Sequence, residues 1–182
     1  MNKYLYYTFI IILPVFLLIL SFKFVLIFTA LSPAQESWLN YFDDKSLQPE
    51  GYLDSEISHM RDVKQIMNKV DIIFYILLAF ITLTLTYYKK NVKLLKKLTS
   101  LGSAATFIFV GIILLLSTLA FNSSFNYFHK IFFPQGNWQF PADSLLLQTW
   151  PIEFFSNISI NIFALTLIIA AITIYISKRY IK

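Results

Sequence analysis

Four long apolar runs constrain the fold more than any other feature of this sequence. They cover residues 4–31, 72–88, 101–121 and 158–176. Each is about as long as the roughly 20-residue helix that crosses a hydrocarbon core of about 30 Å. Charged residues make up only 14% of the chain, whereas soluble domains have roughly a quarter. We therefore expect an all-α membrane protein with four transmembrane helices in a single domain, 1–182.

The charges between these runs predict an orientation. The connection at residues 89–100 is short and rich in lysine, and both chain ends are basic. The longer connections, residues 32–71 and 122–157, lean acidic. By the positive-inside rule, both termini and the lysine-rich loop are cytoplasmic, and the two longer connections form a small extracellular cap. Because orientation and contact with anionic lipid already explain the lysines, we do not expect nucleic-acid binding.

The sequence contains no cysteine. The outer connections therefore depend on packing rather than disulfides, and a thiol nucleophile is excluded. The first apolar run is longer than the hydrophobic region of a typical signal peptide, so we interpret it as an uncleaved anchor with a kink at Pro14. Lys23 lies near its outer end, where it either extends to the headgroups or lines a site in the outer leaflet.

The first outer connection divides into two parts. Residues 32–53, "SPAQESWLNYFDDKSLQPEGYL", show turn signals but no long period, and we expect irregular structure with short strands or turns. The stretch "DSEISHMRDVKQIMNKV" predicts a short outer helix with Asp54 as N-cap. This helix carries His59, and Asp62, three residues later, could orient the imidazole.

The second outer connection is unusually aromatic. Its segment "FNSSFNYFHKIFF" contains His129 and is too short to span the membrane, and "FPQGNW" and "FPADS" are turn-like. "SLLLQTWPIEFF" then returns to the fourth apolar run, with Ser144 or Asp143 as a possible cap. The rings either anchor the loop at the membrane interface or form the apolar wall of a pocket for an acyl chain.

The chain has only two histidines, and the expected topology puts both on the outer side. A histidine transfers protons near neutral pH, since its unperturbed pKa is near 6.5. A metal site would need His59 and His129 with a carboxylate such as Asp62, Asp143 or Glu153, but neither an H-E-x-x-H motif nor a close histidine pair is present. A serine hydrolase is not favoured either, because "ADSLL" lacks the G-x-S-x-G elbow.

Two segments together resemble a known family. "FHKIFFPQGNWQFPADSLLLQTWPIEFF" and "SHMRDVK" are similar to the signatures of the lipoprotein intramolecular transacylase (Lit) family of low-GC Gram-positive bacteria. The resemblance extends over both outer connections and the four-helix layout. It implies a multi-pass enzyme of the bacterial plasma membrane with its active site on the extracellular side.

The resemblance also implies a reaction. The family moves an acyl chain from the sn-2 ester of a lipoprotein's diacylglyceryl group to the α-amine of its N-terminal cysteine, which gives a lyso-form lipoprotein. No cofactor or metal is implied, and the expected partners are a diacylated lipoprotein and membrane lipid, bound by a monomer. The family's two catalytic histidines correspond to His59 and His129.

The residue roles that we expect follow from this chemistry. His129 is the better candidate for the base that accepts the amine proton, and His59 for the group that stabilises the oxyanion or acts as acid. The expected substrate-binding residues are Arg61, Asp62, Lys23 and Asp143 at the polar end, and Phe132, Trp138 and Phe140 in the walls. The alternative functions are a metal-dependent hydrolase of outer-leaflet lipids or esters and a membrane accessory protein without enzymatic activity.

Overall fold

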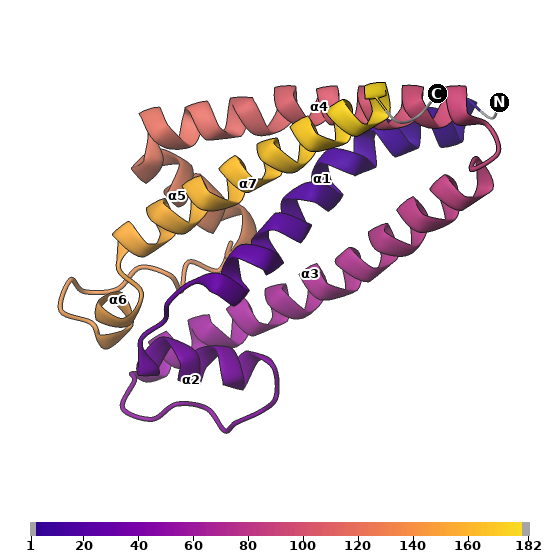
Figure 1. Cartoon of the computed structure of the whole chain (residues 1–182). Helices are drawn as coiled ribbons and strands as arrows, with labels where there is room; N and C mark the ends of the chain where they lie inside the picture. The colour runs from indigo at the N-terminus through magenta and orange to yellow at the C-terminus, as the bar shows by residue number, and fades with distance from the viewer. Residues whose placement is uncertain (1–2, 180–182) are drawn as a thin grey trace.

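The computed structural model describes residues 3–179, and these form seven helices without strands (Figure 1). Four of the helices are long and apolar enough to cross a membrane, which confirms the expected all-α, four-span class. The helices are α1 Lys3–Phe28, α2 Pro33–Phe42, α3 Asp54–Tyr87, α4 Val92–Leu119, α5 Phe121–Phe132, α6 Leu145–Thr149 and α7 Ile152–Arg179.

The membrane bundle is built around α1, α4 and α7, which pack against one another, while α3 packs mainly against α1. Its core contains apolar side chains of α1 such as Phe9 and Leu13, which meet Leu98 of α4. Close approach of α1 and α4 depends on Gly102, because a Cβ there would lie 2.6 Å from the Cδ2 of Leu13. Pro14 lies inside α1, at the turn that makes this contact.

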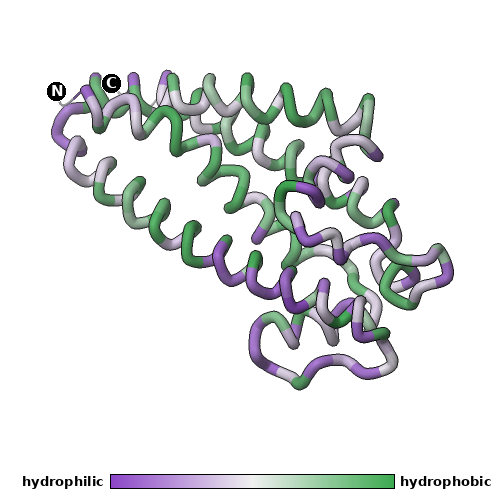
Figure 2. The backbone as a smooth tube through the Cα atoms, turned by 180° about the vertical axis from the view of Figure 1, so that it is seen from behind, coloured by the Kyte–Doolittle hydropathy of each residue, from purple (hydrophilic) through white to green (hydrophobic). Residues whose placement is uncertain are grey.

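Helix α3 is much longer than a membrane crossing. Its 34 residues span about 51 Å at 1.5 Å per residue, against a hydrocarbon core of about 30 Å. Figure 2 shows that it is hydrophilic near Asp54 and hydrophobic towards Tyr87. The expected short outer helix and the second apolar run are therefore one continuous helix. Its N-cap is Leu53 rather than Asp54, and its first turns project beyond the apolar layer.

Two expected loops are helical instead. Residues 33–42 form α2 because Ser32 and Gln35 make a capping box, with Pro33 in the first turn. Ser32 Oγ accepts from the backbone N–H of Gln35, and Gln35 Oε1 accepts from the backbone N–H of Ser32. The expectation of strands or turns there was wrong. Most of the expected loop at 89–100 is the start of α4, whose N-cap Asn91 accepts from the Leu94 amide.

The remaining helices follow their local signals. Ser144 caps α6, as expected, by accepting a hydrogen bond from the Leu147 amide. α6 has only five residues and ends before Pro151, after which α7 begins at Ile152. The aromatic segment that was expected to be too short to span is the 12-residue α5, which packs against the end of α4.

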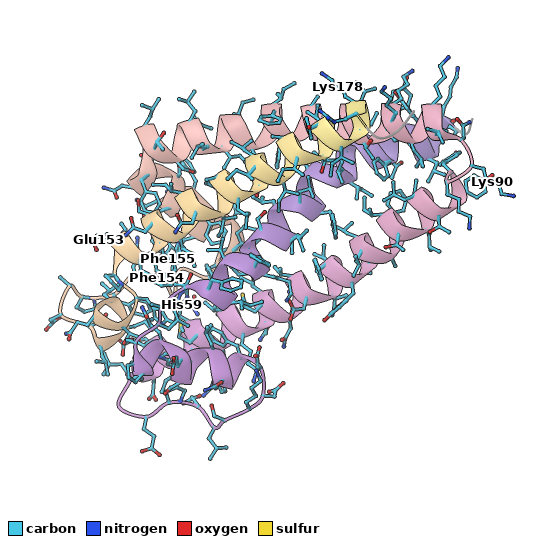
Figure 3. The ribbon with its side chains drawn as sticks, in the orientation of Figure 1. His59, Lys90, Glu153, Phe154, Phe155 and Lys178 are labelled. Atoms are coloured by element: carbon cyan, nitrogen blue, oxygen red, sulfur yellow. The ribbon has the colours of Figure 1, made fainter. Side chains whose placement is uncertain are left out.

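We call residues 32–63 and 121–151 the cap. It has a second apolar core, separate from that of the bundle, formed by Trp38, Phe42, Met60, Leu146 and Trp150. Figure 1 shows both termini at one end of the bundle and α2 and α6 at the other. In Figure 3, Lys90 and Lys178 lie at the first end and His59 at the cap end, so the basic cluster and the histidine are at opposite ends.

The two halves of the cap are joined through the buried Glu56 on the first turn of α3. Its carboxylate accepts from the backbone amides of Leu53 at 2.8 Å and Leu146 at 2.9 Å, and its side chain is 0% exposed. A second link runs from Gln35 Nε2 to the Thr149 carbonyl, at 2.8 Å. The first link holds α6 against α3, one turn before His59, and the second holds α6 against α2.

Candidate active site

His59 on α3 and His129 on α5 lie together where the two halves of the cap meet. Their ring centroids are 6.1 Å apart, and the ring planes differ by 29°. Both side chains are buried, with His59 7% and His129 8% exposed. Figure 3 labels His59 at the cap end of the molecule, the end at which α7 begins with Glu153, Phe154 and Phe155. The expected topology predicted only that both histidines lie on the same side of the membrane. The fold brings their imidazole rings next to each other.

Aromatic rings enclose the pair. Phe133 contacts both imidazoles, with centroid distances of 4.5 Å to His59 and 5.5 Å to His129. Phe140 approaches His59 at 5.6 Å, and Trp138 approaches His129 at 5.0 Å. Phe125, one helical turn before His129, is closest at 4.1 Å. The rings form the apolar, water-poor surroundings in which electrostatic interactions are strong.

The backbone of α5 determines the tautomer of His129. Its Nδ1 lies 2.8 Å from the carbonyl oxygen of Phe125, at i−4 on the same helix. A carbonyl only accepts, so the neutral ring carries its proton on Nδ1 and its lone pair on Nε2. His129 is thus arranged as a proton acceptor at Nε2.

Burial makes both imidazoles neutral at neutral pH. Desolvation, and then repulsion from His129, lower the pKa of His59 to about 4, against smaller opposing effects from Asp62 and Asn137. Desolvation also lowers the pKa of His129, opposed by its hydrogen bond to Phe125. His59 lies outside the apolar part of α3, about 20 Å before Ile72 at 1.5 Å per residue. Neutral rings can accept a proton, which a permanently charged pair cannot.

Asp62 lies one turn after His59 and binds the segment that follows α5. Its Oδ2 accepts hydrogen bonds from Gln135 Nε2 and Asn137 Nδ2, both at 2.7 Å. Asp62 therefore acts on His59 through its charge, and its hydrogen bonds go to the two amides. The sequence pattern predicted that Asp62 orients the His59 imidazole directly, and Asn137 was not part of that prediction.

The other expected site residues are distributed unevenly. Trp138 and Phe140 contact the imidazoles, whereas Phe132 stacks on Phe128 at 4.5 Å and is 47% exposed. Arg61 and Asp143 have exposed side chains.

Lys23 is remote from the histidines. Its Nζ pairs with Asp71 Oδ1 at 2.5 Å, and Asp71 is about 18 Å further along α3 than His59, at 1.5 Å per residue. The structure therefore does not bring Lys23 to the imidazoles.

Four residues of the site were absent from the expected set: Phe125, Phe133, Asn137 and Glu56. The helical spacing of Phe125, His129 and Phe133 on one face would have identified the two rings once α5 was known to be a helix. Glu56 shares the His59 face of α3, but its burial depends on α6, which is 90 residues away in the sequence. Within residues 3–179, no three His, Asp or Glu side chains converge as metal ligands.

The comparisons with known proteins agree on one family. The model of the family described as lipoprotein intramolecular transacylase Lit matches residues 34–155. The fold is similar to the in meso structure of the membrane integral lipoprotein intramolecular transacylase Lit from Bacillus cereus, with a TM-score of 0.76 and 20% identity. That likeness covers 100% of this chain and 95% of the other. A search of curated proteins found no match. The family match covers more than half of the chain and both histidines, and the chain therefore belongs to the lipoprotein intramolecular transacylase family.

Proposed function

We propose that this protein moves an acyl chain within one diacylated lipoprotein, from the sn-2 ester of the diacylglyceryl group to the α-amine of the N-terminal cysteine. The observation that carries the proposal is the buried pair of neutral imidazoles within an aromatic cage. Ester aminolysis needs a base for the amine proton and a proton for the leaving oxygen. Two adjacent imidazoles supply both.

In the proposed reaction, the neutral amine attacks the ester carbonyl and its proton goes to His129 Nε2. This nitrogen carries the lone pair because the hydrogen bond to the Phe125 carbonyl keeps the ring proton on Nδ1. The C–O bond of the tetrahedral intermediate then breaks, and the amide C–N bond remains. His59 interacts with the carbonyl oxygen and delivers a proton to the leaving oxygen. Because His59 is neutral at pH 7, that proton is the one released by the amine, and His59 takes it from the His129 imidazolium before it donates to the substrate oxygens. The lowered pKa of His129 makes its imidazolium a ready donor.

The aromatic rings contribute confinement. Nucleophile and electrophile belong to one flexible molecule, so the barrier includes the entropy of folding it onto itself. Holding a reactive conformer can lower such a barrier by up to about 7–11 kcal/mol in ideal cases. The rings of Phe133, Phe140 and Trp138 offer apolar surface for this purpose. Exclusion of water by the same rings disfavours hydrolysis of the ester.

The positive-inside pattern supports an extracellular cap. Lys90 and Lys178 lie at the end of the bundle opposite His59, which supports a cytoplasmic location for that end. We propose that both termini are cytoplasmic and that the monomer binds its lipoprotein substrate at the outer surface of the bacterial plasma membrane, with no metal or cofactor.

Tandem mass spectrometry of a lipoprotein's N-terminal lipopeptide tests the reaction. The protein is expressed in a host that makes diacylated lipoprotein. We expect one N-linked and one O-linked acyl chain with unchanged total mass. A mass lower by one acyl chain would mean hydrolysis and overturn acyl transfer.

Two controls separate the alternatives. His59→Ala and His129→Ala should each abolish the N-linked acyl chain while expression persists. An N-linked chain that remains in both variants would indicate an accessory protein acting on another enzyme. Activity that survives a strong chelator is expected, and loss that zinc restores would instead favour a metal-dependent mechanism.

A further inference from the structure

The amide of Asn137 has a defined orientation although Asn137 belongs to an irregular segment. Its Nδ2 donates to Asp62 Oδ2 at 2.7 Å and approaches Ser58 Oγ at 3.5 Å. A carboxylate can only accept, so Asp62 binds the NH₂ side of the amide. The amide oxygen, Oδ1, therefore points away from Asp62.

Two buried polar atoms of these residues have no hydrogen-bond partner. One is Asn137 Oδ1, and the other is His59 Nδ1. Buried polar atoms are nearly always satisfied, and each exception needs an explanation. An amide oxygen needs a donor, and the neutral imidazole supplies one if its proton is on Nδ1. The Asn137 side chain raises the pKa of His59, as expected if Asn137 Oδ1 accepts a hydrogen bond from the ring.

We propose that Asp62 and Asn137 are positioning residues: Asp62 orients the Asn137 amide, and Asn137 Oδ1 keeps the proton of His59 on Nδ1. The His59 lone pair is then on Nε2. Because neither atom has a hydrogen-bond partner in the static structure, side-chain adjustment on substrate binding would complete this bond, as catalytic hydrogen bonds commonly tighten in complexes.

This arrangement makes the two histidines equivalent in one respect. The Phe125 carbonyl holds the His129 proton on Nδ1, and Asn137 does the same for His59 from the other half of the cap. Both rings then present Nε2 as the atom that exchanges protons. The catalytic consequence rests on the proposed function: His59 receives the amine's proton from His129 at Nε2 and passes it to the leaving oxygen, with no net change in either ring.

The charge of Asp62 has a second effect in this arrangement. It lies behind the amide and favours the imidazolium that forms transiently on His59. An aspartate, an asparagine and a histidine in series resemble the carboxylate–imidazole pair that fixes the tautomer in hydrolase triads. Here the amide transmits the orientation.

Nitrogen-15 NMR of the histidine rings tests the tautomer directly. The chain has two histidines, so the full-length protein, labelled with ring-¹⁵N histidine, purified with a histidine-free tag and placed in lipid nanodiscs, gives two sets of signals. The His129→Phe variant assigns those of His59. We expect a protonated Nδ1 and an unprotonated Nε2 for His59 at pH 7.5. A His59 ring with its proton on Nε2 overturns the proposal without reference to any activity.

Substitutions then test the chain of bonds. Asn137→Ala should convert His59 to a mixture of tautomers. It should also slow a single turnover on a synthetic diacylated lipopeptide by about 10- to 100-fold, less than the largest losses expected from removing a general acid–base group. KM should change by less than about twofold. Gln135→Ala is the matched control, since it removes the other amide that donates to Asp62 Oδ2. It should leave the His59 tautomer as in wild type and change the single-turnover rate by less than about twofold.

An exchange of the two polar residues provides the rescue. Asp62→Asn alone allows the Asn137 side-chain amide to flip by about 180°, because an asparagine at position 62 can donate as well as accept. The double variant D62N/N137D restores a donor followed by an acceptor, so the His59 proton should return to Nδ1 and the rate should recover at least about 10-fold over D62N. A tautomer that remains as in wild type in Asn137→Ala would refute the positioning role. The expected tautomers with no formation of lyso-form product in wild type would refute the proposed function and leave the positioning intact.

Discussion

The histidine pair and the Lys23–Asp71 pair show two ways of placing ionisable groups among apolar side chains. Lys23 and Asp71 join α1 to α3 with their charges matched, Nζ to Oδ1 at 2.5 Å, and both are partly exposed. His59 and His129 are buried side by side as neutral rings, because burial lowers both pKa values. The opposite charges of Lys23 and Asp71 attract each other and link two helices. Two neutral rings exchange a proton readily, which suits them to chemistry.

The largest effect should come from removing an imidazole. His129→Ala removes the proposed base, so the rate of O-to-N acyl transfer should fall by about 10²–10⁴-fold. Time courses on a purified diacylated lipopeptide, followed by mass spectrometry, measure this. Thermal stability should change little by comparison, and a rate within threefold of wild type would remove the contrast between the two pairs.

The pH dependence of stability is the next largest effect. An unfolded His59 takes up a proton near pH 6.5, whereas the folded ring stays neutral down to about pH 4. The unfolded state therefore binds more protons between these values. The stabilisation is complete above pH 6.5 and lost as pH falls towards 4, by up to about 3 kcal/mol at about 1.4 kcal/mol per pKa unit.

Thermal unfolding of the wild type and of His59→Phe, each at pH 7 and pH 4.5, checks this prediction. The variant cannot titrate at this position, so its loss of stability on acidification should be smaller. Equal losses would mean that His59 is charged in the folded protein, contrary to its burial.

A smaller effect is expected at Glu56, the buried carboxylate that joins the two halves of the cap. Glu56→Gln turns one acceptor oxygen into a donor that faces a backbone N–H, either of Leu53 or of Leu146. One unsatisfied buried group costs about 1–3 kcal/mol. Hydrogen exchange at the Leu146 amide should accelerate accordingly, with Glu50→Gln on the exposed loop as the control. An unchanged exchange rate would mean that α6 is held by its apolar contacts alone.

The smallest effect concerns the ion pair itself. Lys23→Met leaves Asp71 without its partner, and the double variant K23M/D71L removes both charges. A partly exposed pair is worth about 0–1 kcal/mol, so the double variant should unfold within about 1 kcal/mol of wild type and transfer acyl chains at a similar rate. A large loss of activity in the double variant would give Lys23 the substrate-binding role that its pairing with Asp71 does not favour.

Local patterns in the sequence predicted much of the framework. Hydropathy and charge give the four spans, and Ser144 was expected as a helix cap. The missed helices had signals of the same kind. Ser32 and Gln35 form a capping box within four residues, and Phe125, His129 and the C-cap Phe133 follow one another at helical spacing along α5. Irregular structure was expected at residues 32–53 because they show turn signals and no long period, and the aromatic segment was expected only to be too short to span.

What the sequence by itself determined is the class of fold, the kind of residue available for proton transfer, and the family signature, because these depend on composition and on short spacings. Only the tertiary structure decided the environment of those residues. Burial of Glu56 requires α6, and the contact of His59 with His129 requires α5 to fold back beside α3. Orientation of Asn137 requires Asp62, 75 residues earlier in the chain. Desolvation and hydrogen-bond geometry arise from atoms far apart in sequence, and these set the pKa values and tautomers on which the chemistry depends.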